Sequence, residues 1–473
     1  MDIQIVWGLL SEMRQLRRHE HWTRQQLEAH QAEALRLLRE YAYAHSPFYQ
    51  RFHHGLTGAP LHELPVLTKA IMMEHFDELV TDRAIRLEEV KTHMRDLTGD
   101  ERFLGRYRVN ATSGSSGHLG IFLFNRAEWI TVLTSFARAR EWGGIKVDLT
   151  HRIKTATIAS TIPFHMSTRV NATVRSWWMP ELRMAASEPV ETIVERLNAW
   201  QPEVLIAYAS MVRILADEQL AGRLHIRPRA VFTSSEVLTE QTRRRIVQAW
   251  GERLFNQYAA TESGSLAAEC DHHRGMHLME DLVIVEVVDQ DNRPVPPGVY
   301  GDKLLITVLF NRTQPLIRYE LSDSVRLATD PCPSGHPFAL IDDIQGRVED
   351  VLSFPGIAGG MVNVHPLVFS RIMDTLTVSG WQVIQEVDSL HVLLSGVRGE
   401  VSNEQLADTL RQALAEQGAI VSHVEVQRVP TIPKTAAGKA PLIKSNLSNA
   451  SQPAEVPAPG QQGDKTSEKR QWI

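Results

Sequence analysis

Short apolar runs alternate with stretches of helical periodicity between about residues 100 and 330, and this alternation restricts the possible folds more than any other feature. The apolar runs are TATIASTI (155–162), EVLIAYA (203–209) and RAVFTSSE (229–236), and the helical stretches around them cover 125–142, 189–200 and 211–222. Strands that alternate with helices form a parallel sheet covered by helices. Ligands of such sheets bind beyond the carboxyl ends of the strands. The sequence therefore predicts an α/β fold with a binding site at the strand ends.

The pattern changes after residue 280, where Pro and Gly interrupt the apolar runs. Runs of this kind lie at 282–289, 293–310 and 316–328. They are typical of β-hairpins, because Pro and Gly favour turns between strands. We therefore expect a β-rich subdomain next to the parallel sheet. Earlier in the chain, apolar residues at three- and four-residue steps predict an amphipathic helix over 27–43.

A second change falls near residues 346–354 and predicts the division of the chain. We expect a large N-terminal domain over 1–346, built from parallel sheets with the β-rich subdomain. A small mobile α+β domain is predicted over 347–447, with a helix at 402–417 between strands. Residues 448–473 are rich in Pro, Gly and Ser, which predicts a disordered tail.

Composition excludes several classes of protein. The chain has 50 Lys and Arg against 56 Asp and Glu, a net charge of −6, so it lacks the basic excess of a nucleic-acid-binding protein. Two cysteines are too few for a disulfide-stapled scaffold. The N-terminus has no targeting segment, and no run approaches the ~20 apolar residues of a membrane span. We therefore expect a cytoplasmic protein that does not act at a membrane.

The segment NATSGSSGHLGIF (110–122) is a candidate phosphate-binding loop. Its hydroxyl and glycine residues are Ser113, Gly114, Ser115, Ser116 and Gly117. Glycines allow backbone N–H groups to approach an anion, and the hydroxyls add donors. The segment is not a GxxxxGK[ST] loop, because the lysine of that motif is missing. A plain turn is the alternative interpretation.

Five further segments follow this loop in a fixed order. They are TSSEVLTE (233–240), NQYAATESG (256–264), LIRYELSD (316–323), IQGRVEDVL (344–352) and TIPKTAAGKAP (431–441). Together with the loop, they resemble the motifs of the adenylate-forming superfamily, and in detail those of its phenylacetate–CoA ligase branch. The resemblance spans about residues 40 to 445, nearly all of the chain before the predicted tail.

The resemblance implies an ATP- and Mg²⁺-dependent acid–CoA ligase. Such an enzyme joins a carboxylic acid to the α-phosphate of ATP, expels pyrophosphate and passes the acyl group from AMP to the thiol of CoA. This chemistry needs positioning and charge neutralisation more than a protein nucleophile. The cofactors implied are ATP, Mg²⁺ and CoA, and relatives are often homodimers.

Each matched residue takes a role from the resemblance. The β- and γ-phosphates would be held by the Ser/Gly loop, and the adenine by Ser235, Glu236 and Tyr258. Thr261 would hydrogen-bond the α-phosphate, and Glu262 would bind Mg²⁺. Asp323 would accept from the ribose hydroxyls, and Arg347 would lie near the ribose and phosphate. The catalytic Lys439 would stabilise the negative charge on the α-phosphate. The alternatives are a surface acid at Glu262, an Asp323–Arg318 ion pair, and a solvated lysine at Lys439.

Some positions depart from the family pattern. His118 stands in the loop where lysine is usual, Ala259 replaces a glycine, and Glu349 replaces an aspartate. The segment SFPGIAGGMVNVHP (353–366) is about four residues longer than its counterpart in the family. In relatives this loop turns toward the site for the thioester step. Transfer to a carrier protein or an amine, or a degenerate nucleotide-binding protein without catalysis, therefore remain alternatives.

The two cysteines match a second feature of the branch, a zinc site. Some members hold Zn²⁺ with a Cys and a His after the TE motif and a CxC further on. Here Cys270, His277 and Cys332 occupy matching positions, and the second cysteine of the CxC is Ser334. We expect His336 to supply the fourth ligand of a structural Cys₂His₂ site. His272 or His273 could take its place, and two buried, unreactive thiols are the alternative.

The resemblance also predicts the acid-binding pocket. It would lie near the strand ends and be lined by Phe164, His165, Tyr208 and Ser234. With Trp177 and Trp178 nearby, this set favours an aromatic acid, because rings bind by apolar burial and stacking. The same aromatic residues could equally be part of the core.

Overall fold

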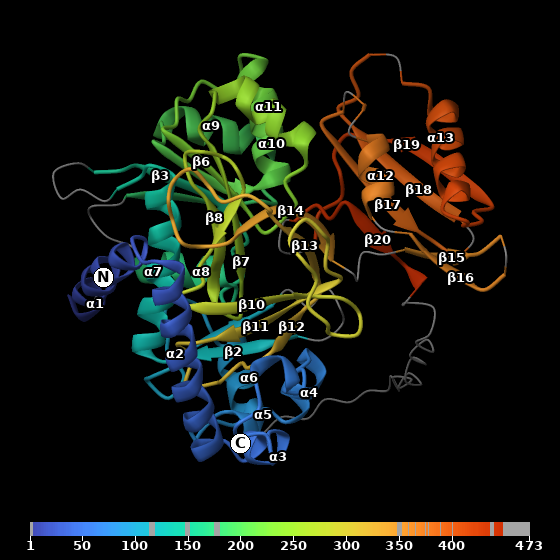
Figure 1. Cartoon of the computed structure of the whole chain (residues 1–473). Coiled ribbons are helices and arrows are strands. Elements are labelled where there is room, and N and C mark those ends of the chain that lie inside the picture. The colour runs from blue at the N-terminus through green and yellow to red at the C-terminus, as the bar shows by residue number, and fades with distance from the viewer. Residues whose placement is uncertain are drawn as a thin grey trace, which may run out of the picture.

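The computed structural model describes most of the chain, and Figure 1 shows how its elements are arranged. The described residues are 3–112, 119–146, 152–174, 180–347, 352–357, 359–364, 366–373, 375–376, 378–387, 389–399, 401–435 and 439–447. The predicted tail at 448–473 lies outside them. Among these residues no helix combines the length and apolar character needed to cross a membrane.

A nine-stranded sheet forms the centre of the large N-terminal part. Its strand order is β13-β14-β9-β8-β7-β6-β5-β3-β4. The parallel half consists of β4 (Glu181–Ala185), β3 (Thr155–Ala159), β5 (Val204–Tyr208), β6 (Ala230–Ser234) and β7 (Leu254–Ala260). The antiparallel half consists of β8 (Gly264–Glu269), β9 (Met276–Leu278), β14 (Leu340–Arg347) and β13 (Asp323–Leu327). The predicted parallel sheet and its strands are confirmed.

Helices cover both faces of this sheet. The helices are α7 (Arg126–Trp142), α8 (Met166–Val174), α9 (Val190–Trp200), α10 (Ala209–Leu220) and α11 (Glu240–Trp250). One hydrophobic core joins α9, α10 and α11 to β3, β5 and β6, while α7 packs its apolar residues with β8 in a different core. Asn125 caps α7 by accepting from Glu128 N, and Glu128 closes the capping box. The helical stretches predicted from periodicity are confirmed.

The β-rich region contains two further sheets. The strands β10 (Val283–Val288), β11 (Lys303–Val308) and β12 (Tyr319–Leu321) form an antiparallel sheet. β1 (Arg108–Ala111) and β2 (Ile121–Phe124) pair on either side of the Ser/Gly loop. The run at 316–328, expected to form one hairpin, is divided at Ser322: β12 joins the small sheet, whereas β13 pairs with β14.

The N-terminal segment is helical. It contains α1 (Ile3–His19), α2 (Arg24–His45), α3 (Pro47–Phe52), a 3₁₀ turn (Leu61–Glu63), α4 (Lys69–Glu74), α5 (Phe76–Leu79) and α6 (Leu87–Arg95). The helix predicted over 27–43 is confirmed as α2, which begins earlier because Thr23 and Gln26 form a capping box. It ends at Ser46, before Pro47, where the backbone is extended.

The C-terminal part has a hydrophobic core of its own. Its elements are the hairpin β15 (Leu352–Pro355) and β16 (Met361–Val364), α12 (Pro366–Met373), β17 (Gly380–Gln385), β18 (Ser389–Ser395), α13 (Asn403–Glu416), β19 (His423–Arg428) and β20 (Ile443–Ser445). The sheet order is β19-β18-β17-β20. The loop that is longer than in the family contains the hairpin β15–β16. In Figure 1 this part, orange to red, stands beside α10 and α11.

A buried ion pair connects α7 to the chain between β9 and β10. Arg138 donates to both carboxylate oxygens of Asp281, at 2.7 and 2.8 Å, and both side chains are fully buried. His19 on α1 lies 2.8 Å from the same carboxylate. Burial alone would raise the pKa of Asp281, but the Arg138 charge and the hydrogen bonds hold it well below its usual range. Three segments distant in sequence therefore depend on one carboxylate.

We predict that Asp281→Asn lowers the free energy of unfolding by about 3–5 kcal/mol, because it leaves Arg138 buried without its counter-charge. The surface variant Arg244→Gln, which breaks an exposed pair with Glu240, should cost less than about 1 kcal/mol. Urea unfolding at neutral pH measures both. Since the folded pKa of Asp281 is lowered, its contribution is present above pH ~4 and declines as pH falls. A cost similar to that of Arg244→Gln would show that the pair is not needed.

Candidate active site

A cavity of about 2010 Å³ opens at the carboxyl ends of β3, β5, β6 and β7, between the central sheet and the C-terminal part. Its walls include most of the residues predicted to form the site: Phe164, His165, Tyr208, Ser234, Ser235, Glu236, Tyr258, Thr261, Glu262, Asp323 and Lys439. These residues come from segments up to 275 positions apart, counted from Phe164 to Lys439. The topology brings them together because parallel strands end at one edge of the sheet.

The base of the Ser/Gly loop lies at this cavity. Thr112 donates its backbone N–H to Gly120 O, and its Oγ1 accepts from Gly120 N, each at 3.0 Å. Thr112 and Leu119 both line the cavity. The predicted phosphate ligands Ser113, Gly114, Ser115, Ser116 and Gly117, with His118, lie outside the described residues. The structure therefore shows that the chain leaves β1 and enters β2 at the wall of the cavity.

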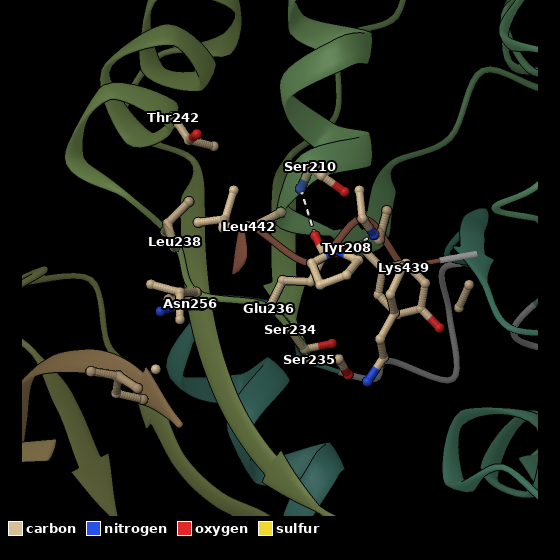
Figure 2. Close-up of a pocket in the computed structure, with 18 of the residues that line it drawn as sticks. Tyr208, Ser210, Ser234, Ser235, Glu236, Leu238, Thr242, Asn256, Lys439 and Leu442 are labelled. Atoms are coloured by element: carbon tan, nitrogen blue, oxygen red, sulfur yellow. Dashed lines mark hydrogen bonds between the residues drawn. The ribbon is translucent and has the colours of Figure 1, made fainter. Parts of the chain in front are cut away.

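Glu236, at the end of β6, binds backbone groups on both sides of the cavity. Its Oε2 accepts from Ser210 N at 2.8 Å (Figure 2). Its Oε1 accepts from Ala440 N at 3.0 Å. Burial raises the pKa of Glu236, and these hydrogen bonds and the Lys439 charge oppose that rise. Ser235 has a φ of 67°, a left-handed conformation that is uncommon outside glycine. Glu236 therefore ties the lysine segment to the strand end.

Tyr258 and Asp323 meet across the antiparallel half of the sheet. The Tyr258 hydroxyl donates to Asp323 Oδ2 at 2.6 Å. Asp323 is also the cross-strand partner of Arg347 in the β13–β14 ladder, although the Arg347 side chain lies outside the described residues. The suggested Asp323–Arg318 ion pair is not the one formed: Arg318 pairs with Glu286 at 3.1 Å. β12 and β13 belong to different sheets, which separates the two side chains.

Thr261 and Glu262 occupy the turn between β7 and β8 and face the cavity. Glu262 is only 4% exposed, so the alternative of a surface acid is wrong. A buried carboxylate requires a polar or charged partner, since transfer of a charge out of water is costly. Its oxygens are of the hard type that Mg²⁺ prefers. The turn can therefore supply a magnesium ligand, with the Thr261 hydroxyl beside it.

Lys439 is half-buried at the cavity, so the alternative of a solvated lysine is wrong. Its Nζ lies 5.8 Å from the centre of the Tyr208 ring, within cation–π range (Figure 2). The Tyr208 hydroxyl accepts from Ser160 N at 2.9 Å, and burial raises its pKa to about 12. His165 Nδ1 lies 2.8 Å from Ser160 Oγ; burial, with the Lys439 charge, lowers the His165 pKa to about 4. At neutral pH, Lys439 therefore lies beside two neutral rings.

A charged cluster holds the C-terminal part against α10 and α11. Asp217 on α10 accepts from Arg245 Nε at 2.6 Å and from Ser379 Oγ at 2.8 Å, and Arg398 lies 3.5 Å away. Arg213, one turn earlier, donates to Val378 O at 2.7 Å. Asp217 is 5% exposed. The cluster fixes the side of the small part from which Lys439 reaches the cavity.

The predicted zinc ligands Cys270, His277 and Cys332 gather in a cluster that is not part of the cavity lining. The ligand atoms of Cys270, His277 and Cys332 all lie within 4.8 Å of one another, and the three residues are buried. Their two sulfurs are 3.6 Å apart, too far for a disulfide but close to the ~3.8 Å between two thiolates on a tetrahedral zinc. Burial raises the Cys270 pKa to about 11 and lowers the His277 pKa to about 4.

The fourth position of this cluster is less defined. The His336 ring lies 4.8 Å from the His277 ring, but His336 is not among the residues whose ligand atoms meet. Ser334 Oγ is 3.3 Å from His277 Nε2. Ser334 therefore lies next to the ligand atoms, although a serine hydroxyl is a poor zinc ligand. The Nδ1 atoms of His277 and His336 are buried without a hydrogen-bond partner among the described residues. His336 and Ser334 are therefore the two candidates for the fourth ligand.

Several residues at the cavity were not found from the sequence. Lys434 donates to Ala186 O at 2.6 Å and joins the C-terminal part to the end of β4. Ser160 hydrogen-bonds with both Tyr208 and His165, and Asp217 anchors the small part. Only Lys434 lies within a motif, TIPKTAAGKAP; Ser160 and Asp217 are polar residues in ordinary strand and helix patterns. Trp177, Trp178 and Glu349 lie outside the described residues.

Comparison with solved structures identifies this architecture. 2-Hydroxyisobutyryl-CoA ligase in its postadenylation state matches with a TM-score of 0.71 and 19% identity, over 91% of this chain and 92% of that one. The same ligase in the thioesterification state matches with a TM-score of 0.57. The chain therefore has the fold of these adenylate-forming ligases.

Two proteins are also similar in sequence. Phenylacetate-coenzyme A ligase from Thermus thermophilus is 25% identical over 372 residues, 74% of this chain and 76% of that protein. Protein CapK from Staphylococcus aureus is 21% identical over 406 residues, 83% of this chain and 82% of that protein. No family model matches the chain. The resemblance to the adenylate-forming superfamily and its phenylacetate–CoA ligase-like branch is confirmed.

We predict that Asp217→Ala loosens the docking of the C-terminal part by about 2 kcal/mol, because Ser379 and Arg398 on that part lose their charged acceptor. Small-angle X-ray scattering should show a larger radius of gyration than for the unchanged protein. Glu218→Ala is the matched control, because Glu218, next to Asp217 in α10, pairs with Arg223 within the large part. Equal radii for both variants would show that the cluster does not hold the small part.

Proposed function

We propose that the chain activates a carboxylic acid with ATP and Mg²⁺ as an acyl-adenylate and then transfers the acyl group to CoA. The observation that carries the proposal is the position of Lys439, held at the strand-end cavity by the hydrogen bond from Ala440 N to Glu236. The motif residues Tyr258, Asp323 and Glu262 line the same cavity. The two ligases described above, which are named for CoA thioester formation, support the second step.

In the first step, a carboxylate oxygen of the acid attacks the α-phosphorus of ATP. The bond from that phosphorus to the bridging oxygen breaks, and pyrophosphate leaves with its electron pair. Lys439 would stabilise the negative charge on the α-phosphate as it develops, and Thr261 would donate a hydrogen bond there. Magnesium supplies charge neutralisation of the phosphates, and Glu262 would hold it. The Ser/Gly loop would bind the leaving pyrophosphate.

The nucleoside fits the remaining part of the site. Asp323 offers a carboxylate that can accept from ribose hydroxyls, and it already accepts from Tyr258. The Tyr258 ring and the end of β6 at Ser235 would border the adenine. The hydrogen bonds of Glu236 to Ser210 and Ala440 suggest a second role for this carboxylate, closing the site over the bound nucleotide. These roles follow the family pattern residue by residue.

In the second step, the thiolate of CoA attacks the acyl carbon and AMP leaves. Relatives rotate the small domain for this step, so the longer β15–β16 segment is the part of the chain that bears on the acceptor. A carrier-protein thiol or an amine remains the second candidate, motivated by that hairpin. A degenerate protein is disfavoured, because Thr261, Glu262 and Lys439 are all retained at the cavity.

The acid is expected to be aromatic. Phe164, His165 and Tyr208 line the cavity, as do Phe136 and Phe232 from α7 and β6. Aromatic walls favour a ring by burial and edge or face contacts. A homodimer and a carrier-protein partner stay predictions from the resemblance.

Lys439→Ala tests the proposal directly. The variant should reduce acid-dependent exchange of pyrophosphate into ATP by about 10²–10³-fold, because the developing α-phosphate charge loses its cation. The matched control is Lys91→Ala, an exposed lysine on α6 that pairs with Glu88 and is not part of the cavity lining. Exchange at the control rate in Lys439→Ala would refute the lysine assignment. Adding CoA, a carrier protein or an amine to the same assay identifies the acceptor by AMP release.

We also propose a structural zinc ion on Cys270, His277 and Cys332, with His336 or Ser334 at the fourth position. Elemental analysis of protein purified without chelator should find about one zinc per chain, and Cys270→Ser should lose it together with several degrees of thermal stability. Ser334→Cys should instead bind zinc more tightly, because a thiolate replaces a hydroxyl beside His277. Less than a tenth of a zinc per unchanged chain would contradict the site.

A further inference from the structure

The cavity continues inward from the strand ends, under α7. Thr157, Ile206 and Phe232 line it, and they are cross-strand partners on β3, β5 and β6, so they share one face of the sheet. Each lies two residues before a strand-end residue of the cavity: Ala159, Tyr208 and Ser234. Two residues of a strand span roughly 7 Å. The cavity therefore has an inner end about that far from the Tyr208–Lys439 mouth.

Arg140 on α7 contributes a cation to this lining. It lies one turn after Phe136, which also lines the cavity, so both project from the same face of the helix. Its neighbour Arg138 faces the opposite way and pairs with Asp281. Of these two arginines on α7, Arg138 is therefore buried in an ion pair, whereas Arg140 lines the cavity.

Among the described residues, the Arg140 side chain has no hydrogen-bond or ion-pair partner. The charge that acts on it is Glu181 at the start of β4, whose Oε1 is already occupied by a hydrogen bond from Thr157 at 2.6 Å. Burial lowers the pKa of Arg140, and the attraction of Glu181 only partly offsets this. Arg140 is half-buried. A guanidinium has five N–H donors, and taking it partly out of water without an acceptor is costly, so such a cation is usually paired with an anion.

Asn171 on α8 provides a second donor at the same cavity. Its side chain is 5% exposed, and its Nδ2 has no hydrogen-bond partner within the described part of the chain. Asn171 and Arg140 both line the cavity, from different helices. Buried polar groups are hydrogen-bonded in most native structures, so two unpartnered donors facing one cavity indicate an acceptor that belongs to the ligand.

We propose that the acid activated by this protein is a dicarboxylic acid, whose second carboxylate binds Arg140, with Asn171 as a further donor. A guanidinium binds a carboxylate through two parallel hydrogen bonds, which is stronger and more directional than a contact with a neutral group. The aromatic and apolar walls leave room for a ring or a short alkyl chain between the two carboxylates. The inference rests on the proposed function and specifies its substrate.

Matched acids test the inference in the pyrophosphate-exchange assay. The pairs are phenylacetate with 4-carboxyphenylacetate, and hexanoate with adipate. The unchanged protein should prefer the diacid of at least one pair by more than tenfold in kcat/KM. Arg140→Gln should lower this preference ratio by about 30- to 100-fold, as expected when one partner of a buried charge pair is removed. Arg140→Lys, which keeps the charge but not the two-pronged geometry, should retain part of it.

Two further measurements separate the outcomes. Arg244→Gln removes an exposed arginine outside the cavity and should leave the preference ratio unchanged. Asn171→Asp replaces a donor of the cavity wall by a negative charge and should lower the ratio even if Arg140→Gln folds poorly. The preferred diacid alone should raise the thermal midpoint of the unchanged protein but not that of Asn171→Asp, a readout independent of activity.

Equal use of both acids of each pair by the unchanged protein would overturn the inference while leaving the proposed function intact. The same holds if Arg140→Gln and Asn171→Asp fold but keep the preference ratio of the unchanged protein. Absence of exchange with every acid, in protein that binds ATP, would instead refute the proposed function, and the inference with it.

Discussion

The position of Lys439 depends on a carboxylate at the end of β6. Glu236 accepts a hydrogen bond from Ser210 on the large part and another from Ala440 on the C-terminal part. Because both donors are backbone N–H groups, the contact fixes the path of the chain on each side and leaves the lysine side chain to face the cavity. The Asp217 cluster acts on the other edge of the same interface. These contacts hold Lys439 at the strand ends, although it belongs to the C-terminal part with its separate hydrophobic core.

The electrostatics of the cavity follow from burial. His165 and Tyr208 lie beside Lys439, and burial keeps both rings neutral at physiological pH. Neutral rings add no charge of their own beside Lys439. Glu262 and Asp323 contribute carboxylates to the same cavity. At the inner end, Arg140 gives the cavity a second positive region. The proposed nucleotide region, reacting centre and distal anion site would thus differ in charge.

Much of the fold could be predicted from the sequence, because hydrophobic periodicity and turn-forming Gly and Pro residues are local features of the chain. The strands at 155–162, 203–209 and 229–236 and the helix over 402–417 formed where apolar spacing placed them. The suggested Asp323–Arg318 ion pair did not form, although the two residues are only five positions apart in the sequence. A single residue, Ser322, separates β12 from β13, and the two strands join different sheets. Arg318 meets Glu286 instead. Sheet membership depends on long-range pairing, which a local pattern does not contain.

The sequence by itself determined the order of the motifs, the α/β fold and the chemical types available at the site, since these depend on residue identity and short-range periodicity. Only the tertiary structure decided which side chains meet. It placed Glu236 between two backbone N–H groups, buried Glu262, and brought Cys270, His277 and Cys332 together from three separate segments. It also turned Arg140 toward a cavity and Arg138 toward Asp281 on the same helix. Burial and pairing belong to the packed chain as a whole, because they depend on contacts between residues that lie far apart in the sequence.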